Sequence, residues 1–339
     1  MRFLVTGTAG FIGFHLARRL LTAGHAVTGI DGMTDYYDIA LKEARLARLC
    51  ALPGFTPRRF MLEEPGAFAA AMAQAKPDVV LHLAAQAGVR YSLVNPGAYV
   101  ASNMVGTYEV LEGVRRHPVR HFLFASTSSA YGGNRAMPFR ETDATATPLT
   151  IYAASKIAGE AMAHAYAHVW GVPTTAFRFF TVYGPWGRPD MALYLFTRRI
   201  LAGEPVEVYD HGRAERDFTY IDDLIEAIWR LTALPPALGA PVSAADTLSP
   251  VAPYRLVNIG AGHPVSVSAM LDVLEAALGR KADRRPKALP PGDLARTVAS
   301  ADLLRDLTGY VPATPIEAGI PAFVAWYREH YGEEAGPPP

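Results

Sequence analysis

The chain has 339 residues, of which 50% are hydrophobic and 19% are charged, and its 32 basic and 32 acidic side chains give a formal net charge of zero. This balance creates no overall field to attract nucleic acid or an anionic membrane, and no apolar run approaches the roughly 20 residues that a membrane span requires. Cys50 is the only cysteine, which excludes an internal disulfide, and we expect a soluble cytoplasmic protein.

Short apolar strands alternate with segments of helical periodicity through the first half of the chain. We expect strands at residues 2–6, 25–31, 78–84, 121–126 and 174–180. We expect helices at residues 11–23, 37–49, 103–116 and 152–170. Such alternation is typical of an α/β fold with a doubly wound parallel sheet of the Rossmann type.

The second half of the chain is richer in proline and glycine, and from residue 181 we expect a smaller α/β lobe. Residues 234–253, rich in Ala, Pro and Ser, predict a surface loop before a strand at 254–259. The expected division is therefore a first domain over 1–180, to which 216–234 and 254–262 return, and a C-terminal lobe over 181–335. We expect residues 336–339 to be a disordered tail.

Three glycines lie between the first predicted strand and the first predicted helix. Gly7 allows a tight turn, Gly10 lets a pyrophosphate approach the backbone, and Gly13 lets the helix pack closely on the strand. The helix N-terminus, which includes Phe11 and Ile12, supplies N–H donors for phosphate. Glycines can be no more than turn residues, but this position favours a dinucleotide-binding loop.

Asp31 is the last residue of the second predicted strand. A carboxylate there can accept hydrogen bonds from both ribose hydroxyls of a dinucleotide and would repel a 2′-phosphate. The next residues, Gly32 and Met33, offer no arginine to neutralise such a phosphate. The cofactor predicted is NAD rather than NADP, although a turn or capping role for Asp31 is the alternative.

Tyr152 and Lys156 form a YxxxK pair on one predicted helix, where a spacing of four puts both side chains on one face. A nearby ammonium favours the tyrosinate, which can then act as a base near neutral pH. Thr127 ends the strand at 121–126, and its hydroxyl can hydrogen-bond the substrate oxygen on which Tyr152 acts. These three residues are the predicted catalytic set.

With these motifs in place, the chain resembles the extended short-chain dehydrogenases/reductases, and closely the UDP-glucuronate 4-epimerases among them. The resemblance runs from Met1 to about Tyr331. It is carried by long matching stretches at 82–92 (HLAAQAGVRYS), 178–192 (RFFTVYGPWGRPDMA), 216–223 (RDFTYIDD) and 252–260 (APYRLVNIG). It implies C4 epimerisation of UDP-glucuronate to UDP-galacturonate through a transient 4-keto sugar, with NAD in the first domain and the UDP-uronic acid in the smaller lobe.

The resemblance also implies roles for single residues. For the cofactor it adds Leu62, Leu83, Ala84, Ala85 and Asn103 to the residues above. For the substrate it implies Ser128, Ser129, Arg90, Thr181, Arg188, Ala192, Tyr209, Arg216 and Asp293.

Within the substrate set the resemblance implies more particular contacts. Thr181 and Arg188 would hold the sugar carboxylate, Arg216 the phosphates, and Tyr209 the uracil. The 4-keto form of a glucuronate is a β-keto acid, which loses CO2 when its carboxylate bond aligns with the carbonyl π system. A guanidinium that grips the carboxylate in another orientation would prevent this loss, and Arg188 is suited to that task.

The sequence departs from the family pattern after the third strand, where related chains carry an aspartate for the adenine amino group. Met61 and Leu62 stand here, followed by Glu63 and Glu64. Adenine recognition is then weaker or is carried by a neighbouring glutamate.

Ser128 and Ser129 reduce the number of reactions that this chain is expected to catalyse. Nucleotide-sugar 4,6-dehydratases carry Asp-Glu after the threonine, and UDP-glucuronate decarboxylases typically carry a glutamate at the second of these positions. Serines at both disfavour dehydration and decarboxylation. A 4-epimerase of UDP-glucose, UDP-galactose or an N-acetyl form stays open, as do a decarboxylase and a non-catalytic NAD-binding regulator.

Two expectations concern assembly and metals. The family resemblance implies a homodimer built through the helices at 103–116 and 152–170, whose apolar residues lie on more than one face. The histidines form no HxH or HExxH pair, so we expect no metal site.

Overall fold

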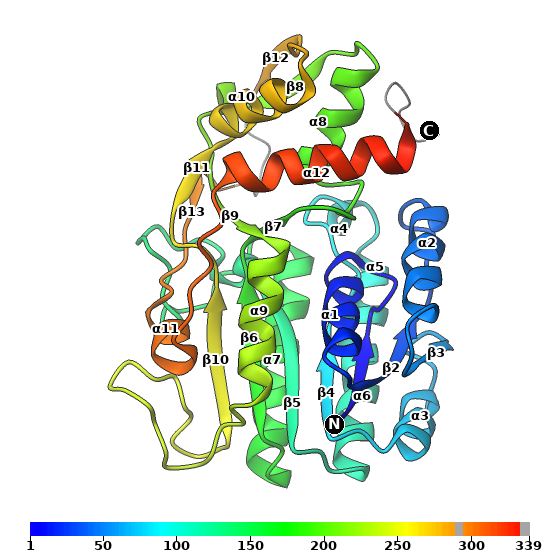
Figure 1. Ribbon diagram of the computed structural model, residues 1–339. Coiled ribbons are helices and arrows are strands. Elements are labelled where there is room, and N and C mark those ends of the chain that lie inside the picture. The colour runs from blue at the N-terminus through cyan, green and yellow to red at the C-terminus, as the bar shows by residue number, and fades with distance from the viewer. Residues whose placement is uncertain (289–293, 333–339) are drawn as a thin grey trace.

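The computed structural model describes residues 1–288 and 294–332, and its largest layer is a seven-stranded sheet (Figure 1). The strand order is β10-β6-β5-β4-β1-β2-β3, and all neighbours are parallel. The strands are β1 (Arg2–Thr6), β2 (Ala26–Asp31), β3 (Phe55–Arg59), β4 (Val79–His82), β5 (His121–Thr127), β6 (Thr174–Phe179) and β10 (Tyr254–Ile259). The order reverses between β1 and β4, which confirms the predicted doubly wound Rossmann sheet.

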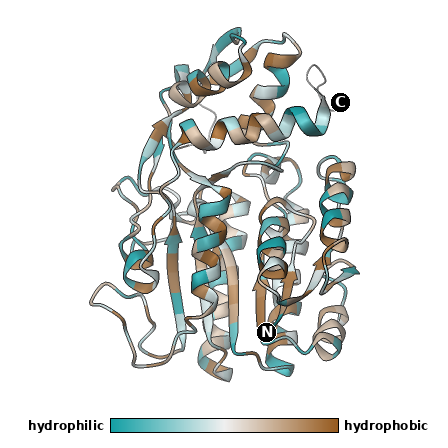
Figure 2. Ribbon diagram, in the orientation of Figure 1, coloured by the Kyte–Doolittle hydropathy of each residue, from teal (hydrophilic) through white to brown (hydrophobic). Residues whose placement is uncertain are grey.

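Helices cover both faces of this sheet, as Figure 1 shows. One face carries α1 (Phe11–Thr22), α2 (Ile39–Cys50), α9 (Ile221–Thr232) and α11 (Asp302–Thr308), and the other carries α3 (Ala67–Ala75), α6 (Gly106–Arg116) and α7 (Ile151–Trp170). Phe3 and Val5 of β1 join the core on the first side, and Leu4 joins the core on the second. Alternate residues thus face opposite helix layers, which explains the apolar runs of the central strands β1, β4 and β5, largely brown in Figure 2.

A smaller group of elements lies above the carboxyl ends of the parallel strands (Figure 1). Its strands are β7 (Thr181–Tyr183), β8 (Val206–Tyr209), β9 (Glu215–Tyr220), β11 (Pro264–Ser266), β12 (Arg284–Lys287) and β13 (Arg296–Thr297), and its helices are α8 (Ala192–Leu201), α10 (Val267–Leu278) and α12 (Ile316–Tyr331). Strand β9 lies between β11 and β13 and also pairs with β7, whereas β8 pairs with β12. Phe323 and Trp326 of α12 share one apolar core with Phe14 of α1, so this group packs directly on the large sheet.

Most elements lie within a residue or two of the expected boundaries, and two of the differences have a clear local cause. Helix α2 begins at Ile39 rather than at 37, because the Asp38 side chain caps it by accepting a hydrogen bond from Ala40 N at 2.8 Å. Strand β4 ends at His82 because Leu83 N and Ala84 N both donate to Thr6 Oγ1 and leave the ladder.

The α-helix expected at 103–116 begins later, at Gly106, and other helical elements lead into it. Short helices α4 (Tyr91–Val94) and α5 (Pro96–Tyr99) and a π-helix, η1 (Val100–Val105), precede α6. The segment before β10 follows the sequence prediction more closely, since the structure places no helix or strand between Thr232 and Tyr254. Within the described ranges, no helix is both long and apolar enough to cross a membrane.

Candidate active site

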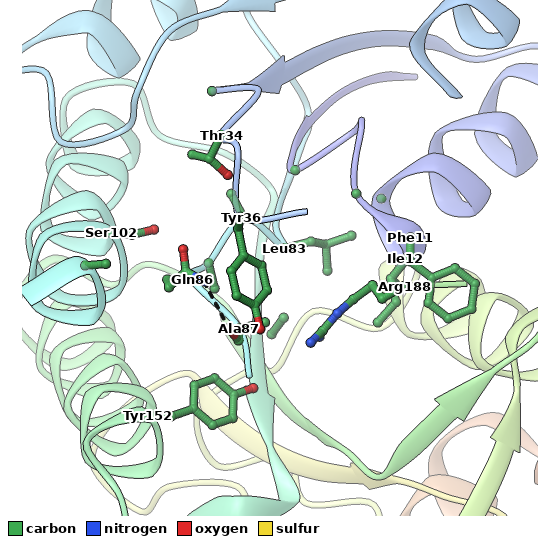
Figure 3. Close-up of a pocket in the computed structure, with 18 of the residues that line it drawn as sticks. Phe11, Ile12, Thr34, Tyr36, Leu83, Gln86, Ala87, Ser102, Tyr152 and Arg188 are labelled. Atoms are coloured by element: carbon green, nitrogen blue, oxygen red, sulfur yellow. Dashed lines mark hydrogen bonds between the residues drawn. The ribbon is translucent and has the colours of Figure 1, made fainter. Parts of the chain in front are cut away.

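A cavity of about 430 Å³ opens at the carboxyl edge of the large sheet, beside the reversal of strand order between β1 and β4. Open α/β sheets bind their ligands at this position. Most residues predicted for cofactor and catalysis line it, namely Gly7, Gly10, Phe11, Ile12, Gly13, Asp31, Leu62, Leu83, Ala84, Ala85, Thr127, Tyr152 and Lys156. Figure 3 shows the Tyr152 ring and the Arg188 guanidinium directed into the same space from separate elements.

The glycine loop has the backbone geometry that a dinucleotide requires. Gly7 adopts a φ of +79°, and its N–H donates to Ile30 O at 2.7 Å. A Cβ on Gly13 would lie 2.0 Å from Gly7 O, so only glycine lets α1 start this close to the loop. The N-terminus of α1 therefore faces the cavity with free approach to its backbone, and this cradle fits a pyrophosphate.

Asp31 is held at the end of β2 by two backbone donors. Ala9 N donates to Oδ2 at 2.9 Å and Met33 N donates to Oδ1 at 2.8 Å. Each oxygen keeps a lone pair for a ribose hydroxyl on the cavity side. Lys42 of α2 lines the same wall and donates to Thr34 O at 2.5 Å. The sequence prediction considered only the two residues directly after Asp31 and therefore missed Lys42, which lies on the following helix.

The wall beyond Asp31 is mainly apolar. Met61, Leu62 and Glu63 line it, and the Met61 sulfur covers Gly32, where a Cβ would lie 2.3 Å from Sδ. Glu64 is engaged locally, since its Oε1 accepts from Met61 N at 3.0 Å. Of the two glutamates proposed for adenine recognition, Glu63 is the one on the cavity wall.

Tyr152, Thr127 and Lys156 meet at the floor of the cavity. Burial raises the pKa of Tyr152, whereas its hydrogen bond with Thr127 and the positive charge of Arg188 lower it. Burial lowers the pKa of Lys156 to about 8 against the opposing effect of Glu160. The Lys156 ammonium donates to Ala125 O at 2.8 Å. Arg188 is thus a second cation near Tyr152 besides the predicted Lys156, and its effect on the Tyr152 pKa is opposed by the charge of Asp190.

Arg178 and Glu160 form a buried ion pair near Lys156. No pattern in the sequence predicts it. Arg178 Nε and Nη2 donate to Glu160 Oε1 and Oε2 at 2.9 and 2.7 Å, and Ser126 Oγ also donates to Oε1. The Arg178 guanidinium stacks 4.5 Å from the centre of the Tyr131 ring. Because the three charges of Lys156, Glu160 and Arg178 alternate in sign, β6 and α7 are held in fixed relation under the catalytic residues.

Asn103 lies behind the cavity wall rather than on it. Its Oδ1 accepts from Gln86 N at 2.7 Å, and its Nδ2 donates to Gln86 O and Ser155 Oγ, both at 3.0 Å. Gln86 itself lines the cavity. Asn103 thus fixes the loop after β4 to α7, close to where a cofactor would lie.

Arg188 enters the cavity from the loop between β7 and α8. Its Nε donates to Asp190 Oδ1 at 3.0 Å and its Nη2 to Asp190 Oδ2 at 2.5 Å. Tyr36, from the loop after β2, donates to the same Oδ2 at 3.1 Å. Asp190 and Tyr36 were not among the predicted site residues, and no spacing in the sequence joins them.

The loop that carries Arg188 is anchored to the large sheet by buried side chains. Arg45 of α2 donates to Trp186 O at 2.6 Å and Gly187 O at 3.1 Å, and also to Ala9 O of the glycine loop at 2.9 Å. The His15 ring contacts Pro185 O through Nε2 at 2.9 Å. The two functional loops therefore share one fully buried guanidinium.

The remaining predicted substrate residues lie around this centre. Thr181, Ser128 and Ala192 adjoin lining residues in the chain, and Ser129 follows Ser128, but none of the four belongs to the described cavity wall. Arg90 lies 4.5 Å from the centre of the Tyr209 ring, which brings together two residues 119 positions apart in the chain.

Two further predicted residues complete the substrate set. Arg216 is on β9, where its Nη1 donates to Glu215 O at 2.9 Å. Asp293 lies outside the described residues, as does the tail at 336–339.

Comparisons with known proteins agree with this geometry. A family model for the NAD-dependent epimerase/dehydratase family matches residues 3–241. A probable UDP-glucuronate 4-epimerase of Rhizobium meliloti (strain 1021) is 52% identical over 334 residues, 98% of each chain. UDP-glucuronate 4-epimerase 1 of Arabidopsis thaliana is 42% identical over 97% of this chain and 77% of its own length. The crystal structure of UDP-glucuronic acid 4-epimerase from Bacillus cereus, in complex with UDP-glucuronic acid and NAD, matches with a TM-score of 0.87 at 30% identity over 98% of this chain and 100% of that one.

Proposed function

The chain belongs to the NAD-dependent epimerase/dehydratase family, and from this premise we propose that it interconverts UDP-glucuronate and UDP-galacturonate by inverting C4. It is an NAD-dependent nucleotide-sugar 4-epimerase. The observation that carries the choice of substrate is Arg188, a guanidinium that faces the same cavity as Tyr152 and can bind a C6 carboxylate.

Proton transfer at the C4 oxygen falls to Tyr152. In the tyrosinate form it accepts the proton of the C4 hydroxyl. It returns that proton after the sugar has turned its other face toward the cofactor. Bound NAD supplies the reversible oxidation and reduction at C4. The Thr127 hydroxyl favours the tyrosinate by its hydrogen bond, and Lys156, fixed on Ala125 O, adds positive charge to the floor of the site.

Arg188 would keep the 4-keto intermediate from losing its carboxylate. A 4-keto uronate keeps its carboxylate only while that group is held away from alignment with the ketone, and two directed N–H donors can impose such an orientation. The uncharged Ser128 and Ser129, which follow Thr127 in a 3₁₀ turn, η2 (Ser128–Tyr131), offer no acid or base for eliminating water. Arg188 therefore disfavours loss of CO2 and the two serines disfavour loss of water, so both features favour epimerisation.

We test the function by an NMR time course with purified enzyme, NAD and UDP-glucuronate. Appearance of UDP-galacturonate, without net NADH or a pentose signal, is the expected result. Accumulation of UDP-xylose or a 4-keto pentose would identify a decarboxylase instead. If UDP-glucuronate stays unchanged while a parallel sample converts UDP-galactose, the enzyme is a UDP-hexose 4-epimerase.

For the parts of the chain, we propose that residues 1–180, with 216–234 and 254–262, bind NAD, and that residues 181–335 bind the UDP-sugar. The supporting contacts are those of β10 with β6 and of α9 with α1. The single exposed Cys50 also agrees with a cytoplasmic enzyme.

We propose further that the enzyme is a homodimer assembled through α6 and α7. These helices pack on each other, and apolar side chains near them, among them Val105, Tyr108, Ile151 and Trp170, are exposed. Burial of such residues against a second copy would remove them from water. Analytical ultracentrifugation should give a mass of twice 36.6 kDa, and a monomer across the micromolar range contradicts the assignment.

A further inference from the structure

The guanidinium proposed to hold the substrate already binds a carboxylate of this chain. Asp190 pairs with Arg188 through two hydrogen bonds, and the two side chains are 26% and 23% exposed. Burial raises the pKa of Asp190, but the pairing with Arg188 and the hydrogen bond from Tyr36 outweigh it and hold that pKa below its ordinary value. The pair is therefore fully ionised at neutral pH.

The geometry of the pair makes it a competitor for a ligand's carboxylate. Nε and Nη2 form an edge of the guanidinium on which both oxygens of a carboxylate can be bound at once. Asp190 occupies that edge. A partly buried guanidinium left without an anion is costly, so Asp190 stabilises Arg188 whenever no other carboxylate is present.

Tyr36 gives Asp190 a second partner. Its hydroxyl donates to Oδ2, and burial together with the Asp190 charge raises the pKa of Tyr36, so it remains a donor across the working pH range. Asp190 can thus lose Arg188 and still keep one strong hydrogen bond. The two partners of Asp190 come from different segments, Tyr36 from the loop after β2 and Arg188 from the loop before α8.

We propose that Asp190 competes with the substrate carboxylate for Arg188 and thereby sets how tightly a uronic acid binds. The inference rests on the proposed function. A uronic acid brings a charge that can replace Asp190, which then remains on Tyr36. A sugar with a neutral C6 hydroxymethyl group cannot replace that charge and leaves the pair closed. Asp190 therefore lowers the affinity for every carboxylate, and only a correctly placed one displaces it.

The test measures binding by calorimetry to NAD-loaded protein in a Tyr152→Phe background, which avoids turnover. Asp190→Asn removes the competing charge with little change of shape. It should tighten UDP-glucuronate binding at least about fivefold, as expected for a charge-assisted hydrogen bond, and leave UDP-glucose binding nearly unchanged. Thermal unfolding and NAD content confirm that the variant is folded.

Asp35→Asn is the matched control, because Asp35 lines the same cavity and no ion pair joins it to Arg188 in the described part of the chain. It should change UDP-glucuronate binding much less than Asp190→Asn. Weaker UDP-glucuronate binding in Asp190→Asn would overturn the proposal and make Asp190 a residue that orients Arg188. Equal changes for both sugars, or for both variants, would also overturn it. Failure of the proposed function shows separately, as no UDP-glucuronate conversion by the unmodified enzyme.

Discussion

The acidity of Tyr152 depends on three different neighbours. Burial and the charge of Asp190 disfavour the tyrosinate, whereas the hydrogen bond with Thr127 and the charge of Arg188 favour it. Lys156, four residues along the same helix, directs its ammonium to Ala125 O. Arg188, which we propose to bind the substrate carboxylate, thus also favours the tyrosinate, so the proposal links substrate charge and proton transfer through one residue.

The role of Thr127 can be read from the pH dependence of turnover. Thr127→Val removes the hydroxyl that lowers the Tyr152 pKa, so that pKa rises and less tyrosinate is present at a given pH. We expect the acidic limb of the kcat profile to move to higher pH, and kcat at neutral pH to fall up to about tenfold, the value of one hydrogen bond. Thr127→Ser, which keeps the hydroxyl, should retain the profile of the unmodified enzyme, and an unshifted limb in Thr127→Val would show that Thr127 does not tune Tyr152.

At the scale of elements, the site depends on how closely loops can approach one another. The glycine loop and the loop at 185–190 belong to segments far apart in sequence, yet both contact α2 through Arg45. Trp186 adopts a positive φ of 60° and packs against Trp326 of α12. The position of Arg188 is consequently decided by the packing of α2 and α12 as much as by its own loop.

Helix α1 can be moved off the glycine loop by one methyl group. Gly13→Ala places a Cβ 2.0 Å from Gly7 O, and relief of this overlap should cost about 1–3 kcal/mol. We expect less NAD retained per protomer after purification, measured by absorbance of the released cofactor. Gly97→Ala is the control, because its Cβ meets only Asn95 Oδ1 at 3.8 Å, and it should retain NAD normally.

Arg45→Met should loosen both loops together. The apolar side chain fills a similar volume but leaves the carbonyl groups of Ala9 and Trp186 without their donor, and each unsatisfied buried group costs about 1–3 kcal/mol. We expect a lower free energy of unfolding in urea and weaker binding of both NAD and UDP-glucuronate. Glu43→Gln is the control, because Glu43 lies on the exposed side of the same helix and pairs with Arg59, and it should leave all three nearly unchanged. If Arg45→Met lowered stability without weakening binding of either ligand, Arg45 would have no role in the site.

At the scale of the whole molecule, stability is tied to histidines that fold in the neutral form. Burial lowers the pKa of His15, His82 and His121 from 6.5 to about 3. Each ring contacts groups far away in sequence, such as Thr107 for His82 and Thr175 for His121. A neutral ring can make these contacts, because a threonine hydroxyl can donate to its unprotonated nitrogen.

Acid should therefore destabilise the fold before its carboxylates titrate. Below pH 6.5 the unfolded chain binds protons at these histidines and the folded chain does not, so stability is full above that pH and is lost progressively toward pH 3. Each histidine contributes on the order of 1 kcal/mol per pH unit. Urea unfolding at several pH values between 7.5 and 5 should show this slope, and His82→Gln should reduce it by one proton. A flat profile would contradict neutral burial.

The sequence alone determined the features that depend on local order and spacing. Apolar runs predicted the parallel strands, because both faces of the sheet are buried, and the glycine spacing predicted the cofactor loop, because a turn and a helix start are local events. Asp31, Thr127, Tyr152 and Lys156 each occupy a strand end or one helix face, so their convergence at the carboxyl edge followed from the fold class.

The groups that hold Arg188 and its loop in place are visible only in the tertiary structure. Tyr36 bonds to Asp190 and Arg45 to Trp186 across 154 and 141 residues of sequence, and no local pattern encodes such contacts. The same holds for Lys42, which reaches the wall beside Asp31 from the following helix. Long side chains from different layers meet there because the core fixes the distances between elements, and hydrogen bonds and charge then select their partners.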